Sequence, residues 1–173
     1  YWVSSFNIDG FRCDMAHLVP LDFWMAARKR LEPLGNLFWL AECEDVAYHN
    51  VFDISYAWEW MHTTEKMMKG NVGVHEIYNV LHSYAQYPKD SFKLFYTSNH
   101  DENSWNGTEY EKYHHCAKAM AVFSYTWKNS VPLVYSGQEM ANTKRLLFFD
   151  KDPLHWVTHP ILASMYSTLN QLR

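Results

Sequence analysis

Acidic side chains occur at the ends of three predicted strands, where they can act together on one substrate. Asp14 ends the first apolar strand, Glu42 ends the second, and Asp101 follows a later one. The carboxyl ends of parallel strands form a common face, and the active sites of α/β proteins lie on that face. We therefore expect the three carboxyls to meet at one opening, where they would transfer protons or attack an electrophilic carbon.

The first two acids have opposed surroundings. Side chains two residues apart in a strand share a face, so Arg12 points the same way as Asp14. A neighbouring guanidinium lowers the pKa of Asp14 and keeps it ionised, which suits a nucleophile. Glu42 follows the apolar residues 38–40, whose surroundings raise its pKa and keep a proton available for a leaving group. Two carboxyls with such opposed environments are typical of glycoside hydrolysis.

The elements that must position these acids alternate between apolar strands and helical patterns, which is typical of parallel βαβ units and an α/β fold. A complete eight-unit barrel needs about 250 residues. The 173-residue chain is therefore either an open α/β sheet or the greater part of a barrel. The predicted strands are 6–14, 37–43, 51–60, 92–98 and 131–135, and the predicted helices are 20–34, 74–84, 110–129 and 160–173, with residues 61–72 a loop that contains a short helix.

The composition excludes several classes of protein. Lys and Arg number 15 against 19 Asp and Glu, and no basic run occurs, so no nucleic-acid partner is expected. No apolar stretch reaches the ~20 residues of a membrane span. The three cysteines, Cys13, Cys43 and Cys116, are too few for a disulfide framework. Strand alternation turns Cys13 and Cys43 away from the acids, where we expect buried free thiols.

Aromatic residues make up 17% of the chain, which fits a dense core or a cleft that stacks on sugar rings. Trp105, close behind Asp101, is the main candidate for stacking. His155 and His159 have the i, i+4 spacing of metal ligands, but Pro160 follows at once and no third ligand is evident. No metal site is therefore expected.

Four ordered segments resemble the α-amylase superfamily, glycoside hydrolase family 13. Residues 7–14, Asn-Ile-Asp-Gly-Phe-Arg-Cys-Asp, are similar to the family's fourth-strand motif, and residues 39–42, Trp-Leu-Ala-Glu, to its fifth. Residues 95–101, Phe-Tyr-Thr-Ser-Asn-His-Asp, resemble the seventh-strand motif, and residues 132–139 the eighth. The resemblance implies a partial (β/α)8 barrel, with strands four to eight and their helices forming the C-terminal portion of the catalytic domain over residues 1–173.

The resemblance also implies a reaction, the retaining hydrolysis of α-glucosidic bonds in starch-like glucans or maltooligosaccharides. Asp14 would be the nucleophile that forms a glycosyl–enzyme intermediate, and Glu42 would be the general acid and then the base. Asp101 would hold the sugar's 2- and 3-hydroxyls. Retention of configuration predicts that the carboxyls of Asp14 and Glu42 lie about 5–5.5 Å apart. The residues expected to bind substrate are Arg12, His17, Asn99, His100 and Trp105.

The chain departs from the family pattern just after Asp14. Many amylases carry Lys-His at the third and fourth residues after the nucleophile, where this chain has His17 and Leu18. That pair serves the leaving-group side of the site, and its His helps to bind calcium in some members. Linkage preference therefore stays open. No cofactor is expected, and a structural calcium ion in a longer parent protein has no support in this chain.

The family's first three strands, its inserted domain and its C-terminal β domain have no counterpart in the chain. The isolated chain is therefore expected to be inactive, because the bound sugar would lose one wall of its site. Open strand edges also favour self-association. Two alternatives stay open, a trehalose- or sucrose-directed transglycosylase of the same family and a non-catalytic carbohydrate-binding barrel fragment. The sequence does not indicate a compartment.

Overall fold

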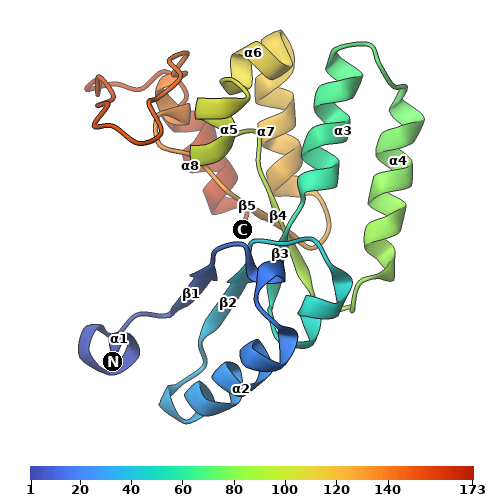
Figure 1. Cartoon of the computed structure of the whole chain (residues 1–173). Coiled ribbons are helices and arrows are strands. Elements are labelled where there is room, and N and C mark those ends of the chain that lie inside the picture. The colour runs from blue at the N-terminus through green and yellow to red at the C-terminus, as the bar shows by residue number, and fades with distance from the viewer.

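A computed structural model describes residues 1–173. Five strands form one sheet, in the order β1-β2-β3-β4-β5, and every neighbouring pair is parallel (Figure 1). The predicted α/β fold with parallel strands is therefore confirmed. The strands are β1 (Gly10–Cys13), β2 (Phe38–Ala41), β3 (Ile54–Tyr56), β4 (Phe92–Phe95) and β5 (Ser130–Pro132).

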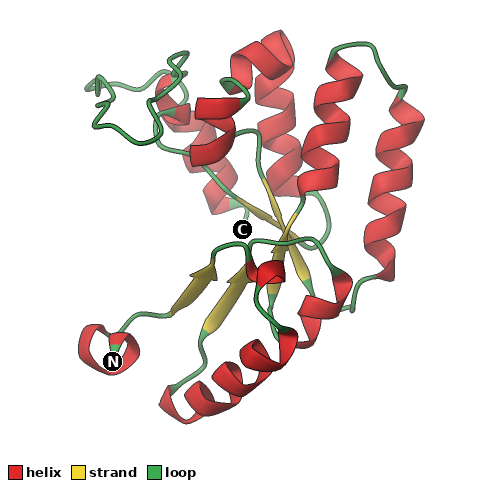
Figure 2. Cartoon of the chain, in the orientation of Figure 1, coloured by secondary structure: helices red, strands yellow, loops and turns green.

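Helices connect the strands and cover the sheet. In Figure 2, α2 lies beside β1 and β2, while the helices from α3 onward form a separate group around the other strands. The α-helices are α1 (Trp2–Phe6), α2 (Leu21–Leu31), α3 (Trp58–Met68), α4 (Val74–Ser83), α5 (His100–Trp105), α6 (Glu109–Tyr113), α7 (Ala117–Thr126) and α8 (Ala163–Gln171). Short 3-10 helices cover Ala16–Leu18, Glu32–Leu34, Val46–Asn50, Tyr84–Gln86, His114–Cys116 and Gln138–Met140.

The alternation of β1 and β2 separates an apolar face from a charged one. Cys13, Trp39 and Ala41 are buried in one cluster, against which Trp24 of α2 packs. Cys13 and Cys43 are both buried and free, as predicted. Because successive side chains of a strand point to opposite faces, the residues next to Cys13 are left on the face away from α2. That face is where the acids lie.

The predicted third strand, 51–60, is wrong at both ends. The strand covers only Ile54–Tyr56, and α3 begins at Trp58 and ends at Met68, so the short helix predicted within 61–72 is longer than expected and starts earlier. The buried residues of α3 are Trp60 and the residues one, four and five positions after it. This spacing places them on one face of a helix. The boundary between β3 and α3 could not be predicted from the apolar residues that lead into α3, because a short apolar run fits a buried strand or a buried helix equally well.

The structure also differs from the predictions at the first strand and inside one predicted helix. The first strand begins at Gly10 rather than residue 6, and a short helix, α1, precedes it. The predicted helix 110–129 is broken, because His114 has a φ of 48° and ends α6 there. A left-handed residue cannot continue a right-handed helix, so the chain restarts in a 3-10 turn before α7.

β1 and β5 are edge strands, each paired on one side only. Self-association through these edges stays a prediction, which light scattering across micromolar concentrations would test. No helix of this structure has the length and apolar character needed to cross a membrane.

A histidine of the 3-10 helix Val46–Asn50, packed against β3, makes stability depend on pH. His49 Nε2 lies 2.7 Å from Ser55 Oγ, and burial, aided by the charge of Lys93, lowers the pKa of His49 to about 4. The unfolded chain takes up that proton near pH 6.5, so the unfolded state binds more protons in this window and stability falls as pH falls.

Lowering the pH from about 6.5 to 5 should reduce the unfolding free energy of the wild type by about 1.5 kcal/mol through His49, and His49→Gln should remove this contribution. Urea unfolding at each pH measures it, with the exposed His62→Gln as the matched control. Equal pH slopes for the wild type and His49→Gln would contradict this prediction.

Candidate active site

One guanidinium binds carboxylates from two neighbouring strands. Arg12 Nη1 lies 2.5 Å from Asp14 Oδ1, and Arg12 Nη2 lies 2.9 Å from Glu42 Oε2. Arg12 Nε donates a hydrogen bond of 3.3 Å to the hydroxyl of Tyr56 at the end of β3. In the sheet register Arg12 pairs with Leu40, so the two acids, each two residues further on, come side by side. The sheet therefore brings the first two predicted acids together.

Glu42 is the buried member of this pair, with a side chain only 7% exposed. Burial raises its pKa, and the charge of Asp14 adds to this, while the Met15 amide and Arg12 oppose it. The Met15 N–H donates to Glu42 Oε2 at 2.7 Å. Met15 has a φ of 40°, a left-handed turn that costs about 1–2 kcal/mol for a residue with a Cβ and brings that amide to the carboxylate.

Asp14 lies in the opposite environment, because its side chain is 74% exposed. Its hydrogen bond with Arg12 lowers its pKa, and the charge of His100 lowers it further. The pKa of Asp14 is therefore lowered and that of Glu42 raised, in the directions that the sequence indicates. At neutral pH this pair combines an ionised carboxylate with one that retains a proton more readily, which is the asymmetry that a nucleophile and a general acid need.

The third acid is presented by the first turn of α5. Asn99 precedes this helix, and its side-chain oxygen accepts the backbone N–H groups of Asp101 and Glu102 at 3.0 and 2.8 Å. Asn99 is only 2% exposed. It therefore caps the helix and positions Asp101, and the substrate contact that we predicted for it stays a prediction. His100 Nε2 lies 3.3 Å from Asp101 Oδ2.

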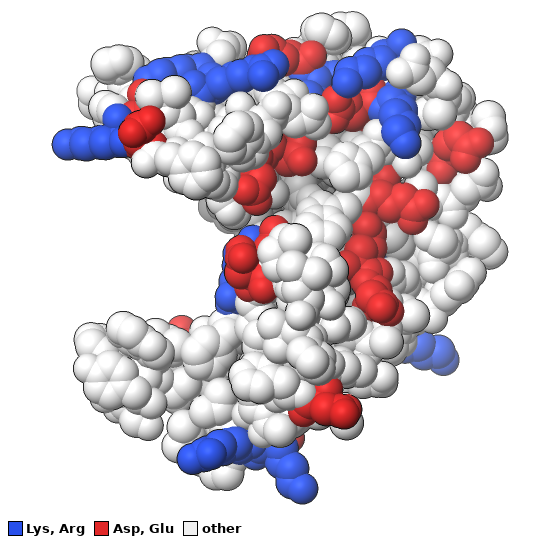
Figure 3. All heavy atoms as spheres, in the orientation of Figure 1, with Lys and Arg blue, Asp and Glu red and all other residues white.

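Asp101 lies close enough to the first two acids for its charge to act on a residue that they also affect. Burial raises the pKa of Tyr56, and the charges of Glu42 and Asp101 raise it further, so both carboxylates act on one hydroxyl. In the same way, His100 next to Asp101 acts on Asp14. Figure 3 shows a deep hollow on one side of the molecule, with red and blue charged atoms on its walls. The ends of β1, β2 and β3 and the start of α5 thus contribute residues to one candidate site.

The two remaining residues that we predicted to bind substrate, His17 and Trp105, lie at the border of the candidate site. His17 is exposed, and its ring centroid lies 6.3 Å from that of Trp58. Trp105 is 64% exposed and packs against Phe148 and Phe149, with ring centroids 5.2 and 6.2 Å away. It forms part of an exposed aromatic surface rather than contacting the acids.

Sequence reasoning singled out neither Tyr56 nor Phe148, although it predicts that the segment 147–156 borders the substrate groove. Tyr56 binds Arg12, and it lies two residues beyond Ile54 on the same face of β3, so strand alternation could have found it. Phe148 stacks on His100 with ring centroids 6.3 Å apart. It comes from a segment without helix or strand, where no periodicity marks a buried or facing residue.

Arg12 should control the ionisation of Asp14. We expect Arg12→Met to raise the pKa of Asp14 toward that of an ordinary aspartate, because the hydrogen bond with the guanidinium is the main cause of the lowered value. Carbon-13 NMR titration of the side-chain carboxyl measures it. Arg30→Met, an exposed change on α2, is the control, and an unchanged Asp14 pKa in Arg12→Met would contradict the assignment.

A parallel α/β sheet with acids at the carboxyl ends of its strands has the arrangement of a catalytic barrel. The chain is 32% identical to a noncanonic maltogenic alpha-amylase, AmyB, from Thermotoga neapolitana, with a TM-score of 0.86 over 99% of this chain and 40% of that protein. It is 26% identical to an alpha-amylase from Lactobacillus plantarum, with a TM-score of 0.83 over 99% of this chain and 44% of that one.

A curated relative, the alpha-amylase MalA of Haloarcula japonica, is 27% identical over 156 residues, which are 86% of this chain and 22% of that protein. No protein-family model matches the chain. The chain thus spans less than half the length of each relative. The resemblance to the α-amylase family is confirmed, and the fold is part of an α-amylase-type (β/α)8 barrel.

Proposed function

We propose that this chain carries the catalytic carboxyls of a retaining glycoside hydrolase that acts on α-glucosidic bonds in starch-like glucans or maltooligosaccharides. The main support is the pair of acids on one guanidinium, whose pKa values are shifted in opposite directions. The similarity to alpha-amylases supports the substrate class.

The proposed reaction has two displacements. Asp14 attacks the anomeric carbon while Glu42 protonates the glycosidic oxygen, so the C–O bond breaks and a glycosyl ester forms on Asp14. Glu42 then takes a proton from water, the water oxygen attacks the same carbon, and the Asp14 carboxylate leaves. Arg12 holds Asp14 ionised, and Asp101 accepts hydrogen bonds from the sugar's 2- and 3-hydroxyls as the ring distorts. Two inversions restore the α configuration.

The stereochemistry of the first product tests this proposal. The chain at high concentration is given α-maltosyl fluoride, because fluoride leaves without full protonation, and proton NMR follows the anomer that forms first. We expect α-maltose. The β anomer would contradict double displacement. Longer oligosaccharides as the main products would favour the transglycosylase alternative, and binding without reaction would favour a non-catalytic barrel fragment.

We also propose that the isolated chain turns over natural glucans poorly. Asp14 is mostly exposed, and positioning errors of ~1 Å can lower a rate ~100-fold. Turnover of maltotriose by the chain and by the Thermotoga neapolitana amylase, compared at equal molar concentration, tests it. We expect the chain to be at least ~100-fold slower, and comparable rates would refute the proposal.

A further inference from the structure

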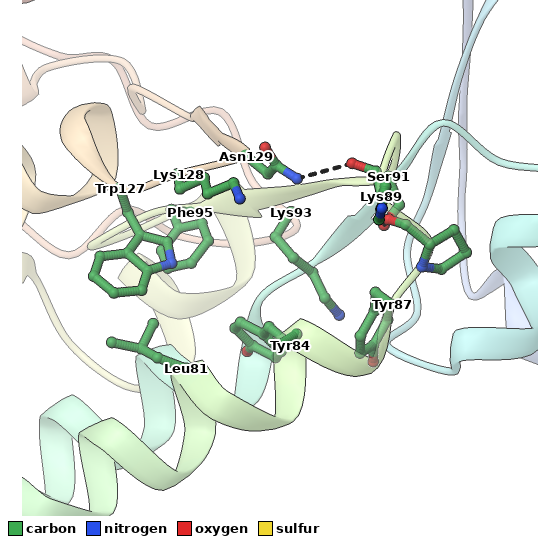
Figure 4. Close-up of a pocket in the computed structure, with 12 residues that line it drawn as sticks. Leu81, Tyr84, Tyr87, Lys89, Ser91, Lys93, Phe95, Trp127, Lys128 and Asn129 are labelled. Atoms are coloured by element: carbon green, nitrogen blue, oxygen red, sulfur yellow. Dashed lines mark hydrogen bonds between the residues drawn. The ribbon is translucent and has the colours of Figure 1, made fainter.

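A further cavity has a lining that includes none of the three acids. It has a volume of about 570 Å³ and lies along β4 and beside the segment that leads into β5 (Figure 4). Its walls come from the end of α4, the following 3-10 helix, β4 and the segment between α7 and β5. The volume lies within the range of small-molecule sites, about 300–1,000 Å³.

One wall of this cavity is apolar and fixed in place. Leu81, Phe95 and Trp127 line it, and Figure 4 shows them together on one side. Leu81 and Phe95 are buried, and the Trp127 ring stacks on Phe123 with centroids 5.2 Å apart and planes 16° apart. Tyr84 adds a further ring to the lining. These surfaces suit a flat aromatic group, because stacked rings gain contact without reorganising the wall.

The charge of the cavity is opposite to that of the whole chain. Its lining includes Lys89, Lys93 and Lys128 and no acidic residue, although the chain has a formal net charge of −4. Lys93 is already neutralised, since its Nζ lies 3.6 Å from a Glu44 carboxylate oxygen and 3.7 Å from the ring centroid of Tyr87. Lys89 and Lys128 are exposed and form no ion pair. Two uncompensated cations therefore stand at the rim.

We propose that this cavity binds a small aromatic anion, with the ring against Leu81, Phe95 and Trp127 and the negative group toward Lys89 and Lys128. An aromatic carboxylate, sulfonate or phosphate has this combination of a flat apolar body and one charged end. The lining contains none of the three acids, and it meets the proposed glycosidase centre only through Lys93, whose Nζ donates to the Tyr56 carbonyl at 3.4 Å.

Calorimetric titration with 2-naphthalenesulfonate at low salt tests the proposal. We expect saturable binding at one site, weakened about tenfold in the Lys89→Glu/Lys128→Glu double variant, because exposed ion pairs contribute modestly. Lys118→Glu, an exposed charge change on α7 outside the lining, should bind as the wild type does. Neutral 2-methylnaphthalene should bind about tenfold more weakly than the sulfonate.

Contact between the anion and the aromatic wall of the cavity can be measured separately from its affinity. The Trp127 indole N–H resonance in a proton–nitrogen NMR spectrum should shift on addition of the sulfonate and not on addition of maltose. The proposal is overturned by an absence of saturable binding, by equal affinity of the neutral analogue, or by an unchanged affinity in the double variant. An unmoved Trp127 resonance despite binding would likewise place the anion elsewhere and overturn the assignment.

Discussion

Replacing Glu42 by Gln should lower the hydrolysis of an unactivated maltooligosaccharide by about 10²- to 10⁴-fold, the usual contribution of a general acid. The first step with α-maltosyl fluoride should change little, because fluoride needs little protonation to leave. Gln keeps the shape of the buried side chain and can still accept the Met15 amide, so the fold is preserved. A large loss of rate on the maltooligosaccharide with little loss on the fluoride is the specific signature of a lost proton donor.

Single-turnover kinetics with both substrates measure that split. Glu59→Gln is the matched control, because Glu59 is an exposed carboxylate in the first turn of α3. It should leave both rates unchanged. Equal losses on the two substrates in Glu42→Gln, or no loss on either, would contradict the role of Glu42 as the acid.

Trp60→Ala should have the largest effect on stability, about 3–5 kcal/mol of unfolding free energy. Trp60 of α3 is fully buried, and its ring centroid lies 5.0 Å from Phe95 of β4 and 5.5 Å from Phe123 of α7. Its removal would leave a cavity where two helices meet the sheet. The total free energy of unfolding of a domain of this size is roughly 5–15 kcal/mol, so the loss is a large fraction of the stability.

Urea unfolding followed by circular dichroism measures this loss. Trp2→Ala removes the same side chain from an exposed position on α1 and should change stability by less than about 0.5 kcal/mol. A loss below about 1 kcal/mol for Trp60→Ala would show that the core around α3 collapses to fill the space, contrary to the packing described.

The positions of Asp14 and Glu42 could be predicted because they depend on strand alternation and on the parallel pairing of neighbouring strands. Arg12 and Asp14 lie two residues apart, and Glu42 ends the neighbouring strand, so alternation and parallel pairing bring all three together. The same rule correctly placed Cys13 and Cys43 on the covered face. The predicted signs of the pKa shifts followed from the charge and apolarity of adjacent residues.

Features that depend on tertiary contacts could not be predicted. The break at His114 rests on a left-handed backbone conformation that residue type does not specify. Asn99 matched a motif position, and only its burial shows that its oxygen caps α5. Phe148 reaches His100 from a segment distant in sequence and without periodicity.

Covalent trapping with a mechanism-based fluoroglycoside of glucose tests the central claim most directly. Its fluorine slows release of the sugar, so a glycosyl ester accumulates on the nucleophile, and peptide mass spectrometry locates it. We predict one sugar on the peptide that contains Asp14, formed slowly by the isolated chain, and no label in Asp14→Asn. A label on any other carboxyl, or labelling that persists in Asp14→Asn, would contradict the claim that these strand ends form a glycosidase centre.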